Sequence, residues 1–216
     1  MNFDTLRFAV ADGATNHSYA SHQWAQTLTD SFVEARPDPG PHEKAFKDIF
    51  RASKAEWILR RPSSDVRGTL FDKGSLATLI GVNITPSSSG GMWRATSVGD
   101  SCLFHLRDDR LVSSFPMVSA KQFNDTPALV SSLWSEHEAQ TATAHATGSL
   151  EVGDVLLLAT DELARWALSV QFSEPQVWAF LALVDQRLLR ALIATELGAG
   201  RMKRDDITLV RVGLGA

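Results

Sequence analysis

Apolar runs that stop abruptly at acidic residues form the most informative pattern in this chain. Three such runs lie near its start, in its late middle and at its end, over residues 6–11, 155–160 and 207–212. Each run is short and contains β-branched residues, which is typical of a β-strand. The acids that border them are Asp12, Asp161 and the pair Asp205 and Asp206. The pattern therefore predicts carboxylates at the ends of three strands.

Helical periodicity follows the first of these runs and surrounds the second. An apolar residue at every fourth position from Trp24 to Phe32 predicts a helix, and a second helix is expected over about 43–59. Later in the chain, a helix is expected to begin near Glu162 and a long helix to run over about 174–197. Helices therefore occupy both the early and the late parts of the chain.

Between these helices the pattern becomes that of an antiparallel β-meander, with predicted strands at 76–84, 92–98, 102–107 and 111–112. Residues 113–149 are less regular, and the Ser-, Thr- and Ala-rich end of this segment indicates a loop or a flap. This order of elements predicts an α+β fold, an α-β-β-α sandwich of two antiparallel sheets flanked by helices. A single domain is expected over residues 1–216.

Composition narrows the function mainly by exclusion. The 216 residues are 44% apolar and carry a net charge of −4, which suits one sizeable core and provides no basic surface for nucleic acid. The single cysteine, Cys102, lies in an apolar strand-like run, where a buried and inert thiol is expected. Neither a secretory leader nor an apolar run of membrane-spanning length is found. We therefore expect a soluble cytoplasmic protein that binds neither nucleic acid nor a membrane.

Carboxylates gathered at strand ends repel one another unless a cation lies between them. Two carboxylates about 4 Å apart repel by roughly 4 kcal/mol at the effective dielectric of a protein site. Oxygen ligands without paired His or Cys favour Mg²⁺ or Mn²⁺ over zinc or copper, and such ions commonly act in pairs on phosphoryl groups. The alternative is that each Asp only caps a helix or ends a strand.

Five short motifs recur in a fixed order along the chain. They occupy residues 8–13, 74–78, 98–101, 153–161 and 205–208, and their sequences are FAVADG, GSLAT, VGDS, GDVLLLATD and DDIT. Together they resemble the motifs of the metal-dependent protein phosphatases of type 2C, over nearly the whole chain. The chain is most similar to a bacterial subgroup in which a small-residue turn and a Trp-Ala helix follow the first motif, here at Trp24-Ala25.

The resemblance implies two Mg²⁺ or Mn²⁺ ions and hydrolysis of phosphoserine and phosphothreonine by direct attack of a metal-bridging water. By position, Asp12 would bridge the two ions and the Gly13 carbonyl would complete one shell. Asp161 and Asp205 would bind the other ion, so these two residues and Asp12 would carry catalysis through metal-bound water. Asp100 would hold a weaker third ion, with a turn-stabilising role as the alternative. The implied partner is a phosphoprotein substrate of a bacterial serine/threonine kinase.

The chain departs from the type 2C pattern at two places. The family carries an acidic pair for the metals on a strand before the first Asp-Gly motif, whereas eleven residues precede Asp12 here. A pseudophosphatase, or a phosphoprotein-binding regulatory module with an incomplete metal site, is therefore the alternative function. Glu162 stands where many members have Gly, and we expect it to start a helix as an acid in the first turn. An unrelated α/β hydrolase is disfavoured because the chain has no Gly-x-Ser-x-Gly nucleophile elbow.

The histidines offer no metal-ligand spacing. His17 lies five residues beyond the Asp of the first motif and is a candidate acid for a leaving alkoxide, although the family's eukaryotic candidate follows the Gly directly, where this chain has Ala14. His105 alternates within a strand and is expected to face solvent or the core. His137 and His145 lie in the irregular segment.

Overall fold

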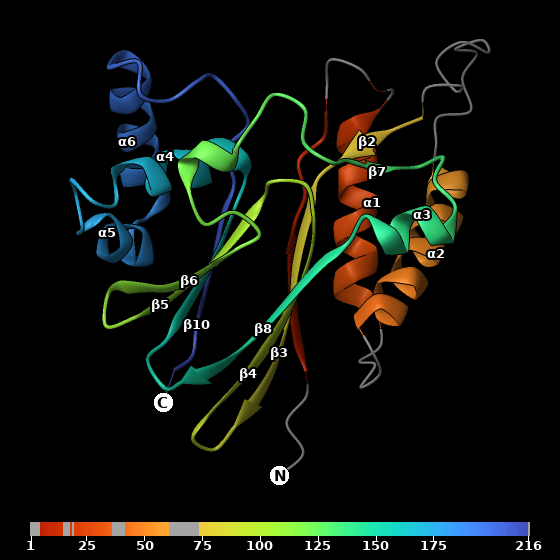
Figure 1. The fold of residues 1–216 in the computed structure, drawn as a ribbon, viewed down its shortest axis with the longest axis horizontal. Coiled ribbons are helices and arrows are strands. Elements are labelled where there is room, and N and C mark those ends of the chain that lie inside the picture. Colours follow the sequence, from red (N-terminus) through yellow and green to blue (C-terminus); the bar gives the residue numbers. More distant parts are fainter. Residues whose placement is uncertain (1–4, 15–17, 19, 36–41, 61–73, 216) are drawn as a thin grey trace.

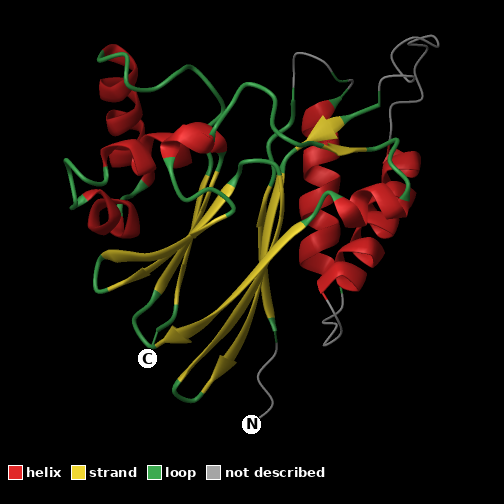
Figure 2. Ribbon diagram, in the orientation of Figure 1, coloured by secondary structure: helices red, strands yellow, loops and turns green. Residues whose placement is uncertain are grey.

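Two antiparallel sheets face each other, and helices cover their outer faces (Figure 1; Figure 2). The computed structural model describes residues 5–14, 18, 20–35, 42–60 and 74–215. This arrangement confirms the α+β class and the α-β-β-α sandwich predicted from the sequence. No helix within those ranges is both long enough and apolar enough to cross a membrane.

The first sheet has the strand order β1-β3-β4-β8, with antiparallel neighbours throughout. Its strands are β1 (Leu6–Val10), β3 (Leu79–Ser87), β4 (Gly90–Val98) and β8 (Ala144–Glu151). Helices α1 (Ser21–Glu34) and α2 (His42–Arg60) cover its outer face (Figure 1). Val10 lies opposite Ile80, so the edge strand β1 ends level with the start of β3.

The second sheet has the order β10-β9-β5-β6. Its strands are β10 (Leu209–Gly213), β9 (Val155–Ala159), β5 (Cys102–Arg107) and β6 (Arg110–Phe115), and its outer face is covered by α4 (Asp161–Val170), α5 (Val177–Leu183) and α6 (Gln186–Gly198). Leu209 lies opposite Ala159, so β10 starts beside the end of β9. The ends of β1 and β9 and the start of β10 consequently meet at one end of the sandwich (Figure 1).

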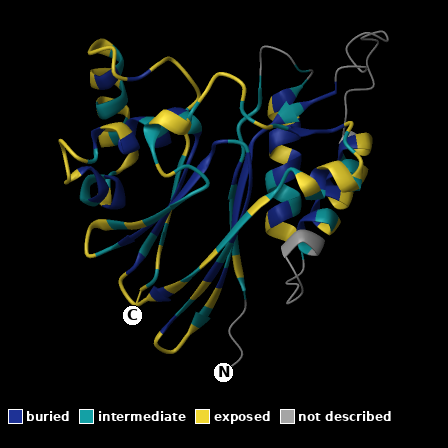
Figure 3. Ribbon diagram, in the orientation of Figure 1, coloured by how far each residue is buried: buried dark blue, intermediate teal, exposed yellow. Residues whose placement is uncertain are grey.

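Successive side chains along each strand point to opposite faces of the sheet. The buried residues (Figure 3) therefore form three clusters, one between the sheets and one between each sheet and its helices. Ile80 and Val82 of β3 pack with Leu156 of β9 between the sheets. Leu79 packs on the opposite face, against α1 and α2, and Leu157 of β9 packs against the late helices. Because both faces of the second sheet are covered, its central strands β9 (VLLLA) and β5 (CLFHLR) are mostly apolar.

Residues 113–149 are more regular than their composition suggests. They contain the end of β6, the short helix η2 (Ala120–Gln122), strand β7 (Val130–Ser131), helix α3 (Glu136–Thr141) and the start of β8. β7 pairs with β2 (Leu76–Ala77), and α3 lies against α2, where Arg51 Nε donates to Glu136 Oε1 at 2.7 Å. Ser135 and Glu138 form a capping box at the start of α3. This local signal is hidden in a Ser- and Thr-rich stretch.

The prediction of a single long helix over 174–197 is wrong, because the structure has two helices there, α5 and α6. Val184 leaves the helical conformation with φ −56° and ψ 132°. The next residue, Asp185, caps α6, and its carboxylate accepts the N–H of Leu188 at 2.8 Å. The apolar periodicity continues across this break, which is why the pattern alone joined the two helices.

A buried carboxylate anchors the end of the sandwich that lies opposite to the end of β1. Asp154 is 2% exposed and accepts hydrogen bonds from Arg107 Nε at 2.9 Å and Nη2 at 2.8 Å. It also accepts the N–H of Glu151 at 2.8 Å and lies 2.8 Å from His105 Nε2. Burial on its own would raise the pKa of Asp154, but these hydrogen bonds outweigh it and hold the pKa below its usual range.

We expect Asp154→Asn to lower the melting temperature by about 5 °C or more, because it leaves buried donors without a charged acceptor. The depressed pKa also means that Asp154 stabilises the fold above about pH 4 and that this stability is lost as the pH falls further. The variant should therefore show a weaker loss of stability below pH 4 in melting scans.

The matched control is Glu151→Gln, because Glu151 pairs with the same Arg107 at 2.6 Å while its side chain is 64% exposed. An exposed ion pair contributes little, so this variant should melt close to the parent. Equal effects of the two substitutions would contradict a special role of the buried carboxylate.

Candidate metal centre

Asp12 is held at the end of β1 by its backbone. Its carbonyl accepts the N–H of Thr78 at 2.8 Å, and its N–H donates to Thr78 Oγ1 at 3.1 Å. The same hydroxyl lies 2.8 Å from Ser101 Oγ, next to Asp100 in the chain. Thr78 thereby connects the backbone of one candidate ligand to the neighbour of another.

Gly13 is required by the close approach of α1. A Cβ atom at this position would lie 2.7 Å from the carbonyl carbon of Ser21 and 2.9 Å from the backbone N of His22. Any other residue would push the start of α1 away from the end of β1. The Asp-Gly pair of the first motif is therefore explained by packing as well as by chemistry, since the small residue keeps Asp12 beside the helix.

Asp161 and Asp205 are presented in the same way from two different segments. Asp161 Oδ1 accepts the N–H of Glu162 at 2.7 Å, and Asp205 Oδ1 accepts the N–H of Asp206 at 2.9 Å. Each carboxylate thus has one oxygen bonded to the following amide and a second oxygen available to a ligand. The two segments are joined by Thr160, whose Oγ1 donates to the Asp206 carbonyl at 3.0 Å.

Asp100 lies deepest of the candidate ligands. It is 3% exposed, and its Oδ1 is buried with no hydrogen-bond partner among the described residues. Burial, followed by the negative charges of Asp161 and Asp205, raises the pKa of Asp100 to about 6. A buried carboxylate oxygen without a partner is costly, and a cation would satisfy it.

The candidate carboxylates affect one another's ionisation. Burial is again the first cause that raises the pKa of Asp12, to about 7, and the charges of Asp161, Asp205, Asp206 and Asp100 follow in that order. Burial and the charge of Asp205 also raise the pKa of Asp161. These side chains therefore lie near enough to repel, and their all-oxygen donor set suits Mg²⁺ or Mn²⁺.

The candidate carboxylates repel one another, but they do not form a prearranged metal-coordination shell. Within the described parts of the chain, no group of three or more Asp, Glu, His or Cys side chains is arranged to hold a metal ion. The residues present fit a hard cation by their chemistry and by the unsatisfied oxygen of Asp100.

An open pocket of about 360 Å³ lies beside Asp12. Asp206, which the sequence did not single out as a ligand, lines this pocket together with His22 and Gln26 of α1. The remaining lining residues are Ala11, Gly13, Ala25, Thr29, Thr160, Ile207 and Thr208. The candidate centre is therefore reachable from solvent along α1, as a phosphate ester requires.

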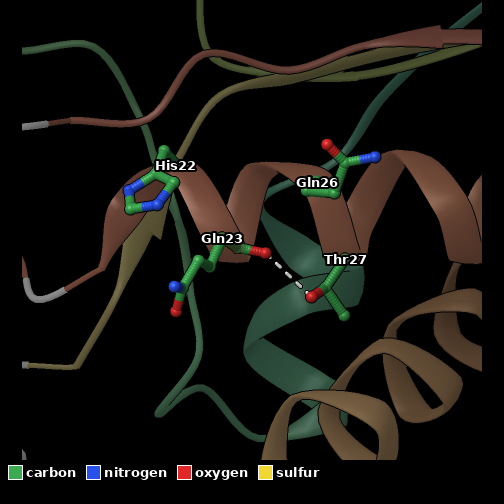
Figure 4. Close-up of a pocket in the computed structure, with 4 residues that line it drawn as sticks. All are labelled: His22, Gln23, Gln26 and Thr27. Atoms are coloured by element: carbon green, nitrogen blue, oxygen red, sulfur yellow. Dashed lines mark hydrogen bonds between the residues drawn. The ribbon is translucent and has the colours of Figure 1, made fainter. Parts of the chain in front are cut away.

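A second pocket, of about 320 Å³, is lined by His22, Gln23, Gln26 and Thr27 (Figure 4). His22 and Gln26 line both pockets, so the two pockets adjoin each other along the same turns of α1. Sequence reasoning missed His22 because the approach of α1 to Gly13 is a tertiary contact with no local signal in the sequence.

Cys102 lies next to the candidate ligand Asp100, and its Sγ donates to the Asp100 carbonyl at 3.2 Å. The thiol is fully buried, as predicted, and burial raises its pKa to about 12, which disfavours the reactive thiolate. His105 lies in the core beside Asp154, at the opposite end of the sandwich. His137 lies on α3 and His145 on β8, while His17 falls outside the described residues.

Several solved structures share this fold over nearly the whole chain. PppA, described as a key regulatory component of T6SS in Pseudomonas aeruginosa, is 19% identical, with a TM-score of 0.58 over 99% of this chain and 91% of that chain. The catalytic domain of the serine/threonine protein phosphatase PstP, in complex with two manganese ions, is 16% identical, with a TM-score of 0.60 over 99% and 88%. The S. agalactiae serine/threonine phosphatase is 15% identical, with a TM-score of 0.54 over 97% and 87%.

The chain therefore has the fold of the bacterial type 2C serine/threonine phosphatases. No protein-family model matches the chain, and no curated protein matches its sequence. At these low identities the likeness establishes the fold alone, and the function has to be argued from the residues of the site.

Repulsion at the centre predicts an unusual pH dependence for the metal-free protein. Because the folded-state pKa of Asp12 is about 7 and the ordinary value is 3.8, the folded state holds a proton that the unfolded state lacks between these values. Stability should therefore fall as the pH rises from about 4 to 7. Asp161→Asn removes one repelling charge, so it should raise the melting temperature in chelator at pH 7.5 and flatten this dependence.

Asp161→Asn should also abolish the stabilisation that Mn²⁺ gives the parent, because the ion loses a ligand. Asp109→Asn, which changes an exposed turn residue between β5 and β6, is the control and should leave both quantities unchanged. If Asp161→Asn destabilises the chelated protein and leaves the Mn²⁺ shift intact, Asp161 is a helix cap and not a ligand.

Proposed function

We propose that this protein is a metal-dependent phosphatase of phosphoserine and phosphothreonine in proteins. The observation that carries the proposal is the meeting of Asp12, Asp100 and Asp161 at one end of the sandwich, where burial and mutual repulsion raise all three pKa values. Such an arrangement is costly without a cation and is accessible from the pocket beside Asp12. The PstP structure with two manganese ions, which has the same fold, supports two ions of this kind.

The chain's own residues divide the work of the centre. Asp12, with the Gly13 carbonyl, would hold one Mg²⁺ or Mn²⁺ ion, and Asp12 would also be a ligand of a second ion. Asp161 and Asp205 would bind this second ion through the carboxylate oxygens that are not engaged by backbone amides. When bound, the ions supply activated water and neutralise charge on the phosphoryl group. Asp100, whose Oδ1 is unpartnered among the described residues, would add a weaker third position.

The partner would be a phosphoprotein made by a bacterial serine/threonine kinase, and the compartment the cytoplasm, where a lone buried thiol stays reduced. The pocket beside Asp12 is open to solvent along α1, so a phosphorylated side chain on a protein surface could enter it. We propose no nucleic-acid or membrane partner for this surface, which is acidic at its centre.

A second candidate function is a phosphoprotein-binding module without turnover. The lack of a prearranged group of three ligands among the described residues favours it. Both functions use the same pocket, but only the phosphatase needs the carboxylates to converge on ions. Metal affinity and turnover therefore separate the two.

The test of the phosphatase is hydrolysis of a phosphothreonine peptide with Mn²⁺, measured as released phosphate. Excess chelator should abolish the activity, and Asp12→Asn and Asp161→Asn should each lower it about 100-fold or more, because each removes a metal ligand. Asp109→Asn, in the exposed turn between β5 and β6, is the matched control and should keep near-parent turnover. Turnover that persists in chelator would contradict the metal mechanism.

A further measurement separates the phosphatase from the binding module. We expect this 216-residue chain to bind Mn²⁺ weakly, because no group of three or more potential ligands is prearranged among the described residues. Electron paramagnetic resonance of free Mn²⁺ counts bound ions even at weak affinity. Weak binding of two ions with slow turnover supports the phosphatase, whereas phosphopeptide binding with no bound Mn²⁺ would favour the module.

A further inference from the structure

Glu162 is buried beside Asp161, where it forms the strongest set of contacts near the candidate centre. It is 4% exposed and accepts hydrogen bonds from Arg165 Nε at 3.0 Å and Nη2 at 2.5 Å. It also accepts the backbone N–H of Lys203 at 2.6 Å. The carboxylate of Glu162 thus joins α4 to the segment that leads into Asp205. An acid that only started the helix, as predicted from the sequence, would not need these contacts.

Arg165 makes a second link between α4 and the same segment. Its Nη2 atom, already bonded to Glu162, also donates to the carbonyl of Arg201 at 3.1 Å. The pair of Glu162 and Arg165 therefore contacts both a carbonyl and an amide of residues 201–203, only two residues before Asp205. Met202, between these two contacts, is 5% exposed and packs in the core with the late helices.

A second buried glutamate holds the segment from its other side. Glu196 of α6 is 5% exposed and accepts from Arg201 Nε at 2.6 Å and Nη2 at 2.5 Å, and from Trp166 Nε1 at 2.7 Å. Residues 201–203 are thus fixed between α4 and α6. The segment that carries Asp205 cannot move away from Asp161 without breaking hydrogen bonds to a buried charge.

This restraint opposes a force that the candidate centre itself produces. The hydrogen bond from Thr160 to the Asp206 carbonyl holds the segments of Asp161 and Asp205 together, so these two negative carboxylates repel when no cation is present. Asp205 is on the surface, and a loop with few contacts would move outward to relieve the repulsion. The Glu162–Arg165 pair, however, holds the segment next to α4.

We propose that Glu162 and Arg165 are positioning residues, which act through Asp205 to keep its carboxylate within reach of a cation held by Asp161. The inference rests on the proposed metal site, but it concerns ion binding and does not need turnover. Neither side chain touches the reacting atoms. Their contribution is to set the spacing of two ligands that come from different parts of the chain.

The test measures Mn²⁺ affinity by electron paramagnetic resonance and thermal stability in chelator. Glu162→Gln and Arg165→Met should each weaken one of the two Mn²⁺ sites about tenfold, the usual effect of losing a group that orients a ligand. Arg165→Lys keeps the charge but not the planar fork, so it should not restore the affinity. Arg107→Met is the matched control, because it breaks a comparable buried pair at the opposite end of the sandwich, and it should lower stability without changing Mn²⁺ affinity.

A double-mutant cycle shows whether Glu162 acts through Asp205. In an Asp205→Asn background, Glu162→Gln should cause no further loss of Mn²⁺ affinity, because the ligand that it positions is already gone. If Glu162→Gln fails to fold in chelator, the same cycle with Arg165→Lys decides the question.

The outcomes separate the inference from the proposed function. Folded variants that bind two Mn²⁺ ions as tightly as the parent, or losses that add fully to Asp205→Asn, would overturn the positioning role alone. A parent that binds no Mn²⁺ would overturn both proposals. Affinity that depends on Glu162 in a protein without turnover would leave the positioning role standing and overturn only the catalytic function.

Discussion

Repulsion between carboxylates that the fold brings to one end of the sandwich is the constraint on which the rest of the site depends. Asp12, Asp100 and Asp161 come from three separate strand ends, and burial raises the pKa of each. A protein gains nothing in stability from such a cluster. Its presence is understandable when the cost is recovered on binding a divalent cation, which the oxygen-only donor set favours.

The scaffold resists that repulsion with hydrogen bonds that hold the backbone around the candidate ligands. Thr78 fixes the backbone of Asp12, and Thr160 fixes the carbonyl of Asp206. Glu162 and Arg165 hold the segment before Asp205. Each restraint comes from an element whose position is set by the core. The packed sheets and helices therefore fix the positions of the candidate metal ligands.

The two ends of the sandwich show opposite uses of a buried carboxylate. Asp154 receives hydrogen bonds from Arg107 and lies beside His105, which keeps its pKa low and makes it part of the framework. Asp100 at the other end has an oxygen with no partner among the described residues and a pKa that is raised. The difference marks the second end as the place where a ligand is needed. Because sequence identity to the phosphatases of the same fold is low, this conclusion rests on the chain's own residues.

The sequence by itself determined the fold class and the approximate strands, because covered sheets require apolar runs and the runs end at conspicuous acids. It also indicated which carboxylates meet, through the order of five motifs. It could not show the break at Val184 and Asp185, because apolar periodicity continues through it. Nor could it show the regular elements within 113–149, whose capping box and pairings are spread over a polar stretch.

Only the tertiary structure decided how the site is supported. Glu162 looks like an ordinary acid at a helix start, and its role depends on Lys203 and Arg165 meeting it in space. Asp206 and His22 face one pocket although nearly the whole chain separates them. Local patterns record which residues are apolar or charged along one segment. The spacing of charges from different segments is set by the packing of sheets and helices, and that packing has no local signature in the sequence.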